Sequence, residues 1–207
     1  MKDITNHILP RKFYERDTSI VARDLLGKAL VKYSGPEMVG GIIMETEAYY
    51  GPDDPASHAY RGKTHRSKIM FGKPGIAYVY LCYGMYHLLN IVTESEGKPG
   101  AVLIRALKPM WGIDIMKKRR NLDIKLTDGP GRLTVALGIN MKDNGADIVS
   151  GEKRLYIFDY KWSNNNLKIM VTSRIGIKKG EEKPLRFLIN NKQVKFLKYL
   201  NNIVSGL

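Results

Sequence analysis

The chain of 207 residues contains a single cysteine, Cys82, which excludes an internal disulfide and a metal cage built from cysteines. Because Cys82 stands in an apolar run, we predict a small core residue rather than a nucleophile. No apolar run approaches the ~20 residues of a transmembrane helix, and the first residues lack the apolar segment of a signal peptide. These absences favour a reducing, intracellular location, so we expect a cytoplasmic protein without a membrane partner.

Acidic residues are also scarce, with 20 Asp and Glu against 34 Lys and Arg, a net charge of +14 and a pI near 9.7. The excess is larger than solubility requires and predicts a polyanionic partner. An anionic membrane is the weaker alternative, since no basic amphipathic helix with exposed aromatic residues is apparent. Solvated basic faces without a specific partner remain the other alternative. The first basic region comprises Lys117, Lys118, Arg119, Arg120, Lys125 and Arg132, and a second follows Lys168.

We find no internal repeat, low-complexity segment or linker, and we predict one domain spanning residues 1–207. Strands outnumber helices and are clustered, which predicts an α+β fold around a mostly antiparallel sheet with flanking helices. Asp17 is predicted to cap a first helix that ends near Leu26. The strands are expected at residues 28–33, 38–47, 101–107, 154–160, 168–173 and 186–189, and further helices at residues 110–120 and 194–200.

Acids, tyrosines and a histidine lie at and after the end of the strand expected at residues 38–47. Side chains alternate along a strand, so Glu45, Glu47 and Tyr49 should share one face. The turn formed by the prolines and glycine that follow can bring His58 back toward Glu47. A carboxylate beside tyrosines and a histidine is typical of sites that activate water. The alternative is a strand end that shows its acids to solvent.

A tyrosine-rich segment, residues 76–90, reads as two strands that flank Gly84-Met85. Glycine at the first central position predicts a two-residue type II′ turn, and hence a protruding β-hairpin. That turn pairs Tyr83 with Tyr86 and places both rings at the tip. We predict that Tyr86 packs back onto its own sheet and that Tyr83 acts as a group inserted into a partner.

Residues 127–138 read as a glycine-rich turn that leads into a helix. The free N–H groups at the start of that helix, with Arg132 beside them, suit a phosphate group. The pattern lacks the Lys-Ser/Thr of a P-loop and is a weak indication by itself.

Taken together, these segments closely resemble the alkyladenine (3-methyladenine) DNA glycosylase family, and the resemblance runs nearly from end to end. One departure is Thr64-His-Arg-Ser67, where the family often has Thr-Pro-Arg-Asn. The matching segments, in order, are residues 22–28, 45–58, 70–90, 103–109 and 129–133, followed by Arg174-Ile-Gly-Ile and Lys183-Pro-Leu-Arg-Phe187.

The resemblance implies a single domain around a curved antiparallel sheet, without a metal or other cofactor. It implies a monofunctional DNA glycosylase that acts as a monomer on double-stranded DNA containing damaged purines. The expected lesions are 3-methyladenine, 7-methylguanine, hypoxanthine and ethenoadenine, in an order that the sequence does not rank. Such an enzyme turns the damaged nucleotide out of the duplex, hydrolyses the N-glycosidic bond and leaves an abasic site for base excision repair.

The resemblance also implies roles for individual residues. Glu47 corresponds to the general base that activates water, and Glu45 is expected to be structural. Tyr83 corresponds to the residue that fills the space left by the flipped nucleotide. The remaining assignments are Tyr49, His58 and Tyr80 stacking on the base, Asn90 excluding the guanine amino group and Arg105 supporting the flipped nucleotide's backbone. The positive charge and the glycine-rich turn, rather than the resemblance, lead us to expect that Arg119, Arg120 and Arg132 bind DNA.

The strand pairing predicted for the hairpin conflicts with these roles. A two-residue turn places Val79 opposite Asn90, so Tyr80 and Asn90 would lie on opposite faces of the hairpin. Since both are expected at the pocket, a bulge, a strong twist or a different register is required.

Parts of the sequence are also compatible with two other classes of function. A metal-dependent hydrolase could use Glu47, Asp53, Asp54 and His58, although their spacing matches no standard metal motif. A non-catalytic nucleic-acid-binding protein would explain the positive charge but would give Glu47 no role. Survival of activity in a chelator tests the first alternative, and release of free base from methylated DNA tests the second.

Overall fold

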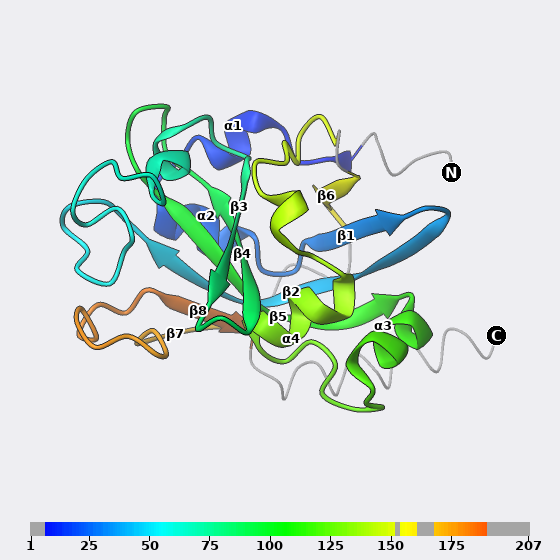
Figure 1. Ribbon diagram of the computed structural model, residues 1–207. Helices are drawn as coiled ribbons and strands as arrows, with labels where there is room; N and C mark the ends of the chain where they lie inside the picture. The colour runs from blue at the N-terminus through cyan, green and yellow to red at the C-terminus, as the bar shows by residue number, and fades with distance from the viewer. Residues whose placement is uncertain (1–6, 152–153, 161–167, 190–207) are drawn as a thin grey trace.

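The computed structural model describes residues 7–151, 154–160 and 168–189, and in this part of the chain eight strands form one antiparallel sheet. The strand order is β3-β4-β5-β2-β1-β6, while β8 pairs with β2 and β7 pairs with β8 (Figure 1). The predicted α+β fold around a mostly antiparallel sheet is confirmed. The strands are β1 (Ala29–Ser34), β2 (Glu37–Tyr49), β3 (Ala77–Cys82), β4 (Tyr86–Val92), β5 (Ala101–Trp111), β6 (Leu155–Phe158), β7 (Ile169–Thr172) and β8 (Arg186–Ile189).

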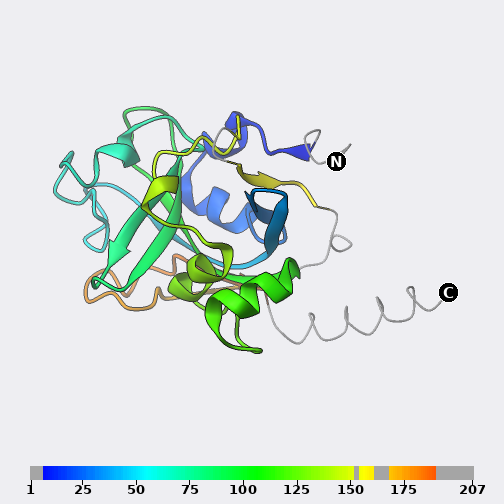
Figure 2. The ribbon, with the colours of Figure 1, turned by 45° about the vertical axis from the view of Figure 1, so that its right-hand side comes forward.

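The sheet curves around helix α2 (Thr18–Asp24), as the turned view shows (Figure 2). Bulges interrupt the pairing of β2 with β5 at Gly40/Gly41 and between Ile43 and Thr46. Each bulge bends the strand and increases its twist, so the long central strand can follow a curved path. The curvature that the family resemblance implied is therefore present.

Helix α2 forms because Asp17 caps its first turn and its inner face is apolar. The Asp17 carboxylate accepts hydrogen bonds from the N–H groups of Ser19 (2.9 Å) and Ile20 (3.3 Å). Val21 and Ala22 are completely buried in the core. The predicted cap is confirmed, although the helix ends at Asp24 rather than near Leu26.

The remaining helices lie beside the sheet. They are α1 (Arg11–Tyr14), α3 (Ile113–Arg120), α4 (Pro130–Leu137) and the short 3₁₀ helices η2 (Lys68–Phe71) and η3 (Met141–Asp143). Helix α4 packs against β4 and β5, and α3 packs against α4 (Figure 1). We predicted a strand ending at residue 107 and a helix beginning at residue 110. This was wrong, because residues 108–111 continue β5 by pairing with Gly40–Ile42 of β2.

The hairpin of β3 and β4 has a three-residue turn, so the predicted two-residue turn was wrong. Cys82 pairs with Tyr86, and both Tyr83 (φ 49°) and Gly84 (φ 68°) have left-handed backbone conformations. This register places Tyr78 opposite Asn90. Tyr78, Tyr80 and Asn90 therefore share one face, and the conflict in the predicted register is removed.

Two further predictions concern a helix at residues 194–200 and membrane-spanning segments. The helix predicted at residues 194–200 lies outside the described residues. Within the described part of the chain, no helix combines the length and apolar character needed to cross a membrane.

Candidate active site

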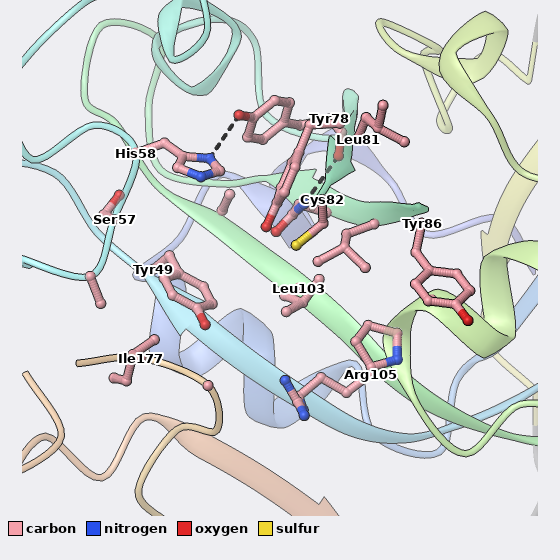
Figure 3. A pocket seen from close by; sticks show the side chains of 18 of the residues that line it. Tyr49, Ser57, His58, Tyr78, Leu81, Cys82, Tyr86, Leu103, Arg105 and Ile177 are labelled. Carbon is pink, nitrogen blue, oxygen red and sulfur yellow. Dashed lines mark hydrogen bonds between the residues drawn. The ribbon is translucent and has the colours of Figure 1, made fainter. Parts of the chain in front are cut away.

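A cavity of about 610 Å³ opens where the end of β2, the β3–β4 hairpin and β5 meet two loops (Figure 3). This volume falls within the range of ordinary small-molecule sites. Tyr49 and His58 lie on one side of the cavity and Tyr86 on the other, with Leu103 and Arg105 of β5 between them. The cavity is therefore built from segments that are distant in the sequence.

An aromatic wall, made by Tyr49, His58, Tyr78 and Tyr80, borders this cavity. The His58 and Tyr80 ring centroids lie 4.6 Å apart in an edge-to-face arrangement, and those of Tyr78 and Tyr80 lie 5.2 Å apart. Nδ1 of His58 is hydrogen-bonded to the Tyr78 hydroxyl at 2.9 Å. The structure thus brings together the three predicted stacking residues and adds Tyr78, which lies two residues before Tyr80 on the same face of β3.

Glu47 lies directly behind the wall of the cavity and has no exposed surface. Its Oε2 atom accepts hydrogen bonds from the Tyr49 hydroxyl (2.8 Å) and from Nη1 of Arg105 (3.1 Å). Its Oε1 atom accepts one from the backbone N–H of Ile175 (2.8 Å). All three donor residues border the cavity. The predicted common face of Glu47 and Tyr49 is confirmed, whereas the described hydrogen bond of His58 goes to Tyr78 rather than to Glu47.

Arg105 joins two acids of β2, Glu45 and Glu47. Its Nε donates to Oε1 of Glu45 at 2.7 Å, and the same oxygen accepts from Nε of Arg186 on β8. Burial disfavours the charged guanidinium, but the carboxylates of Glu47 and Glu45 raise the pKa of Arg105 above its ordinary value. These contacts give Glu45 the structural position that we predicted, and they place Arg105 beside Glu47 at the cavity.

Asn90 is almost completely buried on the cavity side of the hairpin, where its Nδ2 donates to the Tyr78 carbonyl at 3.2 Å. Cys82 follows Tyr80 on the same face and is half-buried at the cavity. The prediction that Cys82 is a core residue was therefore wrong, because the face of β3 that carries Tyr80 and Cys82 borders the cavity.

The hairpin tip carries the most exposed large hydrophobic side chain of the described residues, Tyr83, which is 87% exposed. The position that we predicted for Tyr83 is confirmed. We predicted that Tyr86 packs back onto its own sheet, and this was wrong. Tyr86 lies over Gly131 in the first turn of α4, where a Cβ atom would come within 2.7 Å of the Tyr86 ring. Glycine at position 131 is therefore what permits this contact.

The predicted DNA-binding arginines lie away from the cavity lining. Nη1 of Arg119 donates to the Ala136 carbonyl near the end of α4 (3.2 Å), and Arg132 forms an ion pair with Asp128 (3.0 Å). Neither these two arginines nor Arg120 lines the cavity. Their contact with DNA stays a prediction.

The family of the chain is shown by comparison with known proteins. The family model described as methylpurine-DNA glycosylase matches residues 12–193. The chain belongs to this family. A candidate 3-methyladenine DNA glycosylase of Carboxydothermus hydrogenoformans is 50% identical over 191 residues, which cover 90% of this chain and 98% of the relative. Comparable proteins with the same description come from Alkaliphilus oremlandii (47% identical over 197 residues, 88% and 96% coverage) and from the Wolbachia of Brugia malayi (50% over 187 residues, 90% and 99%).

Membership of the methylpurine-DNA glycosylase family confirms the resemblance predicted from the motifs. It also confirms the predicted enzyme class, a DNA repair hydrolase that acts on N-glycosyl bonds, and DNA as the partner. The metal-dependent alternative loses one of its four ligands, because both oxygens of Asp54 are bound by Arg174 in the interior. Among the described residues, no group of three or more His, Cys, Asp and Glu side chains could hold a metal ion.

Two arginines beside the aromatic wall of the cavity could not be identified from the sequence. Arg174 lies with its guanidinium carbon 4.7 Å from the Tyr49 ring centroid, and Arg66 lies 4.8 Å from that of Tyr80. Arg174 belongs to a segment that matched the family, but no local pattern links it to an aromatic ring more than a hundred residues earlier. Arg66 belongs to the one loop that departs from the family pattern.

The environment of His58 keeps its imidazole neutral. Burial, together with the positive charge of Arg66, lowers the pKa of His58 to about 4. In the unfolded chain the ordinary pKa is ~6.5. Between these values the unfolded state binds a proton that the folded state does not, so folding stability must fall as the pH decreases through this window.

We therefore expect the wild type to lose more stability at low pH than a His58→Gln variant does. After allowance for partial exposure of the imidazole, the extra loss between pH 7 and pH 5 is about 1 kcal/mol. Urea unfolding of both proteins at the two pH values measures this difference, and all other titrating groups cancel in the comparison. An identical pH dependence would show that His58 is not held neutral.

Proposed function

We propose that this glycosylase turns alkylated purines out of duplex DNA and hydrolyses their N-glycosidic bond with a water activated by Glu47. The observation that carries the proposal is a carboxylate fixed by three hydrogen bonds directly behind an aromatic cavity. The exposed Tyr83 at the rim supports it, since a flipped nucleotide leaves a gap in the duplex that a ring can fill.

The aromatic wall would bind the flipped base by stacking. Base–aromatic stacking is worth ~1–3 kcal/mol per base and tolerates different purines. A positively charged base, such as 3-methyladenine or 7-methylguanine, gains further by cation–π attraction to the tyrosine faces. The neutral imidazole of His58 suits such a base, because a charged imidazole would repel it. Asn90, held by the Tyr78 carbonyl, would exclude the exocyclic amino group of normal guanine by contact.

In the proposed reaction the water oxygen attacks C1′ of the sugar while the bond from C1′ to the base nitrogen breaks. The bonding electron pair leaves with the base, so a cationic alkylpurine departs as a neutral molecule. Glu47 takes the proton of the water, and its negative charge stabilises the positive charge that develops on the sugar. Arg105 and Tyr49 hold the carboxylate in place. No amine is involved, so the product is an abasic site in an uncut strand.

The Glu47 side chain is fully buried in the protein without DNA. A water can reach the carboxylate only after Tyr49, Arg105 or the Ile175 segment moves. We propose that entry of the flipped nucleotide causes this displacement, so that water is admitted only when a base occupies the cavity.

The test is release of free base from duplexes that each carry one defined lesion, followed by alkaline cleavage of the abasic sites. We expect release of 3-methyladenine and 7-methylguanine, with hypoxanthine and ethenoadenine as further substrates, and unchanged activity in a chelator. Binding of these duplexes without release of base would favour a non-catalytic DNA-binding protein. Loss of activity in the chelator would instead favour a metal-dependent hydrolase.

A further inference from the structure

Arg174 and Asp54 form an ion pair in the interior next to the cavity, with side-chain exposures of 0% and 1%. Nη1 and Nη2 of Arg174 donate to the two carboxylate oxygens of Asp54 at 2.6 and 2.7 Å. Nη1 also donates to the Ala48 carbonyl at 3.0 Å. A bidentate pair of this kind fixes the orientation of the guanidinium as well as its position.

The first connection from this pair to the reaction runs through Tyr49. The Arg174 guanidinium covers the Tyr49 ring at 4.7 Å from its centroid. Tyr49 borders the cavity and Arg174 does not, so the guanidinium supports a part of the ring that is turned away from the cavity. The hydroxyl of the same ring donates to Oε2 of Glu47. The position of Arg174 therefore determines where this donor points.

The second connection runs through the backbone. Ile175, the residue next to Arg174, donates its N–H to Oε1 of Glu47 at 2.8 Å. Because the Arg174 side chain is fixed to Asp54 and to the end of β2, the following peptide group is fixed as well. Both oxygens of Glu47 thus receive a hydrogen bond from a group that Arg174 holds.

Asp54 extends the same connection to the loop that carries His58. Its carboxylate accepts hydrogen bonds from the N–H groups of Tyr50 (3.0 Å) and Ala56 (3.3 Å), and its carbonyl accepts one from Ser57 (2.9 Å). Burial alone would raise the pKa of Asp54, but the hydrogen bonds from Arg174 and the backbone lower it below its ordinary value. The carboxylate is therefore charged and keeps all these donors in place.

We propose that the Arg174–Asp54 pair positions Glu47 and Tyr49 for base excision. Arg174 touches neither water nor base in this proposal, so it is a positioning residue rather than a catalytic one. The proposal rests on the proposed function, because the carboxylate being positioned is the general base of that reaction. A small misplacement of such a group lowers a reaction rate strongly, since the reacting atoms must be held in line.

The alternative is a pair that only stabilises the fold, and the chain offers a matched control for it. Lys32 and Asp143 form another buried ion pair, at 2.6 Å and with exposures of 12% and 6%. Lys32 also donates to a backbone carbonyl, that of Gly138, at 2.7 Å. Neither residue lines the cavity. Asp143→Asn should therefore destabilise the protein without acting on Glu47.

The experiment compares Arg174→Lys, Arg174→Met and Asp143→Asn at a temperature where urea unfolding shows all of them folded. Single-turnover base release is measured over a range of enzyme concentrations. For Arg174→Lys we expect a rate at saturation ~10²-fold lower, with the half-saturating concentration nearly unchanged, and a larger loss for Arg174→Met. Asp143→Asn should keep the wild-type rate. A native rate for Arg174→Lys, or an equal loss for Asp143→Asn, would overturn the proposal.

Hydrogen exchange gives a second readout that does not depend on activity. The Ile175 amide should exchange faster in Arg174→Lys than in the wild type and should be unchanged in Asp143→Asn. If the wild type released no base at all, the proposed function would fail, and the exchange comparison would still decide whether Arg174 holds this peptide group. Unchanged protection of Ile175 in Arg174→Lys would refute the positioning role in either case.

Discussion

A Glu47→Gln variant is expected to bind damaged DNA as the wild type does but to lose nearly all base release. The amide keeps the size of the carboxylate and one carbonyl oxygen, yet it cannot take the proton of the attacking water. General-base catalysis contributes roughly 10²–10⁴-fold, and loss of the negative charge beside the developing sugar cation should add to this. Gel-shift binding and single-turnover release on a hypoxanthine duplex measure the two quantities separately.

Glu45→Gln is the matched control, since Glu45 lies on the same strand face and shares Arg105 with Glu47. Glu45 also accepts from Arg186, so its replacement weakens the support of Arg105 but leaves the proposed base intact. We expect a clearly smaller loss of rate than for Glu47→Gln. If Glu45→Gln lost nearly all activity while Glu47→Gln stayed active, the roles of the two acids would be reversed.

The local parts of the fold could be predicted from the sequence because their causes are local. Asp17 caps α2 with its own side chain, and the alternation of β2 places Glu47 and Tyr49 on one face. The boundary between β5 and α3 was predicted wrongly because pairing partners decide it. Residues 108–111 are strand only because Gly40–Ile42 lie opposite them across a bulge.

The turn of the β3–β4 hairpin was predicted wrongly for a related reason. Gly84-Met85 satisfies the local rule for a two-residue turn, but Tyr83 also adopts a left-handed conformation and lengthens the turn by one residue. A shift of one residue turns every side chain of a strand to the other face, so this single backbone conformation decides whether Tyr80 and Asn90 meet at the cavity. The sequence does not indicate this conformation, because tyrosine, the residue at position 83, rarely has a positive φ.

Part of the positive charge lies in the interior, where basic side chains are paired with acids. Arg105, Arg174 and Arg186 neutralise acids around the active site, while Lys32 does so in another part of the interior. These cations are paired with acids of the fold, and their side chains are largely covered by protein. The net charge of +14 therefore remains an argument for a polyanionic partner but does not say which basic residues meet the DNA.

Replacing Tyr83 by serine should separate insertion into the duplex from binding in the cavity. Tyr83 is 87% exposed at the hairpin tip. It borders the cavity but is not one of the four rings of the aromatic wall. If it fills the gap left by the flipped nucleotide, Tyr83→Ser shifts the flipping equilibrium back toward the stacked state. The loss of one stacked ring, ~1–3 kcal/mol, corresponds to a rate about 5- to 150-fold lower for a well-paired hypoxanthine.

Mispaired or single-stranded lesions cost less to extrude, so they depend less on an inserted ring. Tyr83→Ser should consequently release hypoxanthine from a mismatch or a single strand at a rate much closer to that of the wild type. Tyr83→Phe keeps the ring and should behave as the wild type on every substrate, which controls for the hydroxyl. Single-turnover release from paired, mispaired and single-stranded hypoxanthine measures these ratios. Equal losses for Tyr83→Ser on all three substrates would mean that Tyr83 acts on the cavity or on the hairpin fold, because only an inserted residue makes its effect depend on how firmly the base is paired.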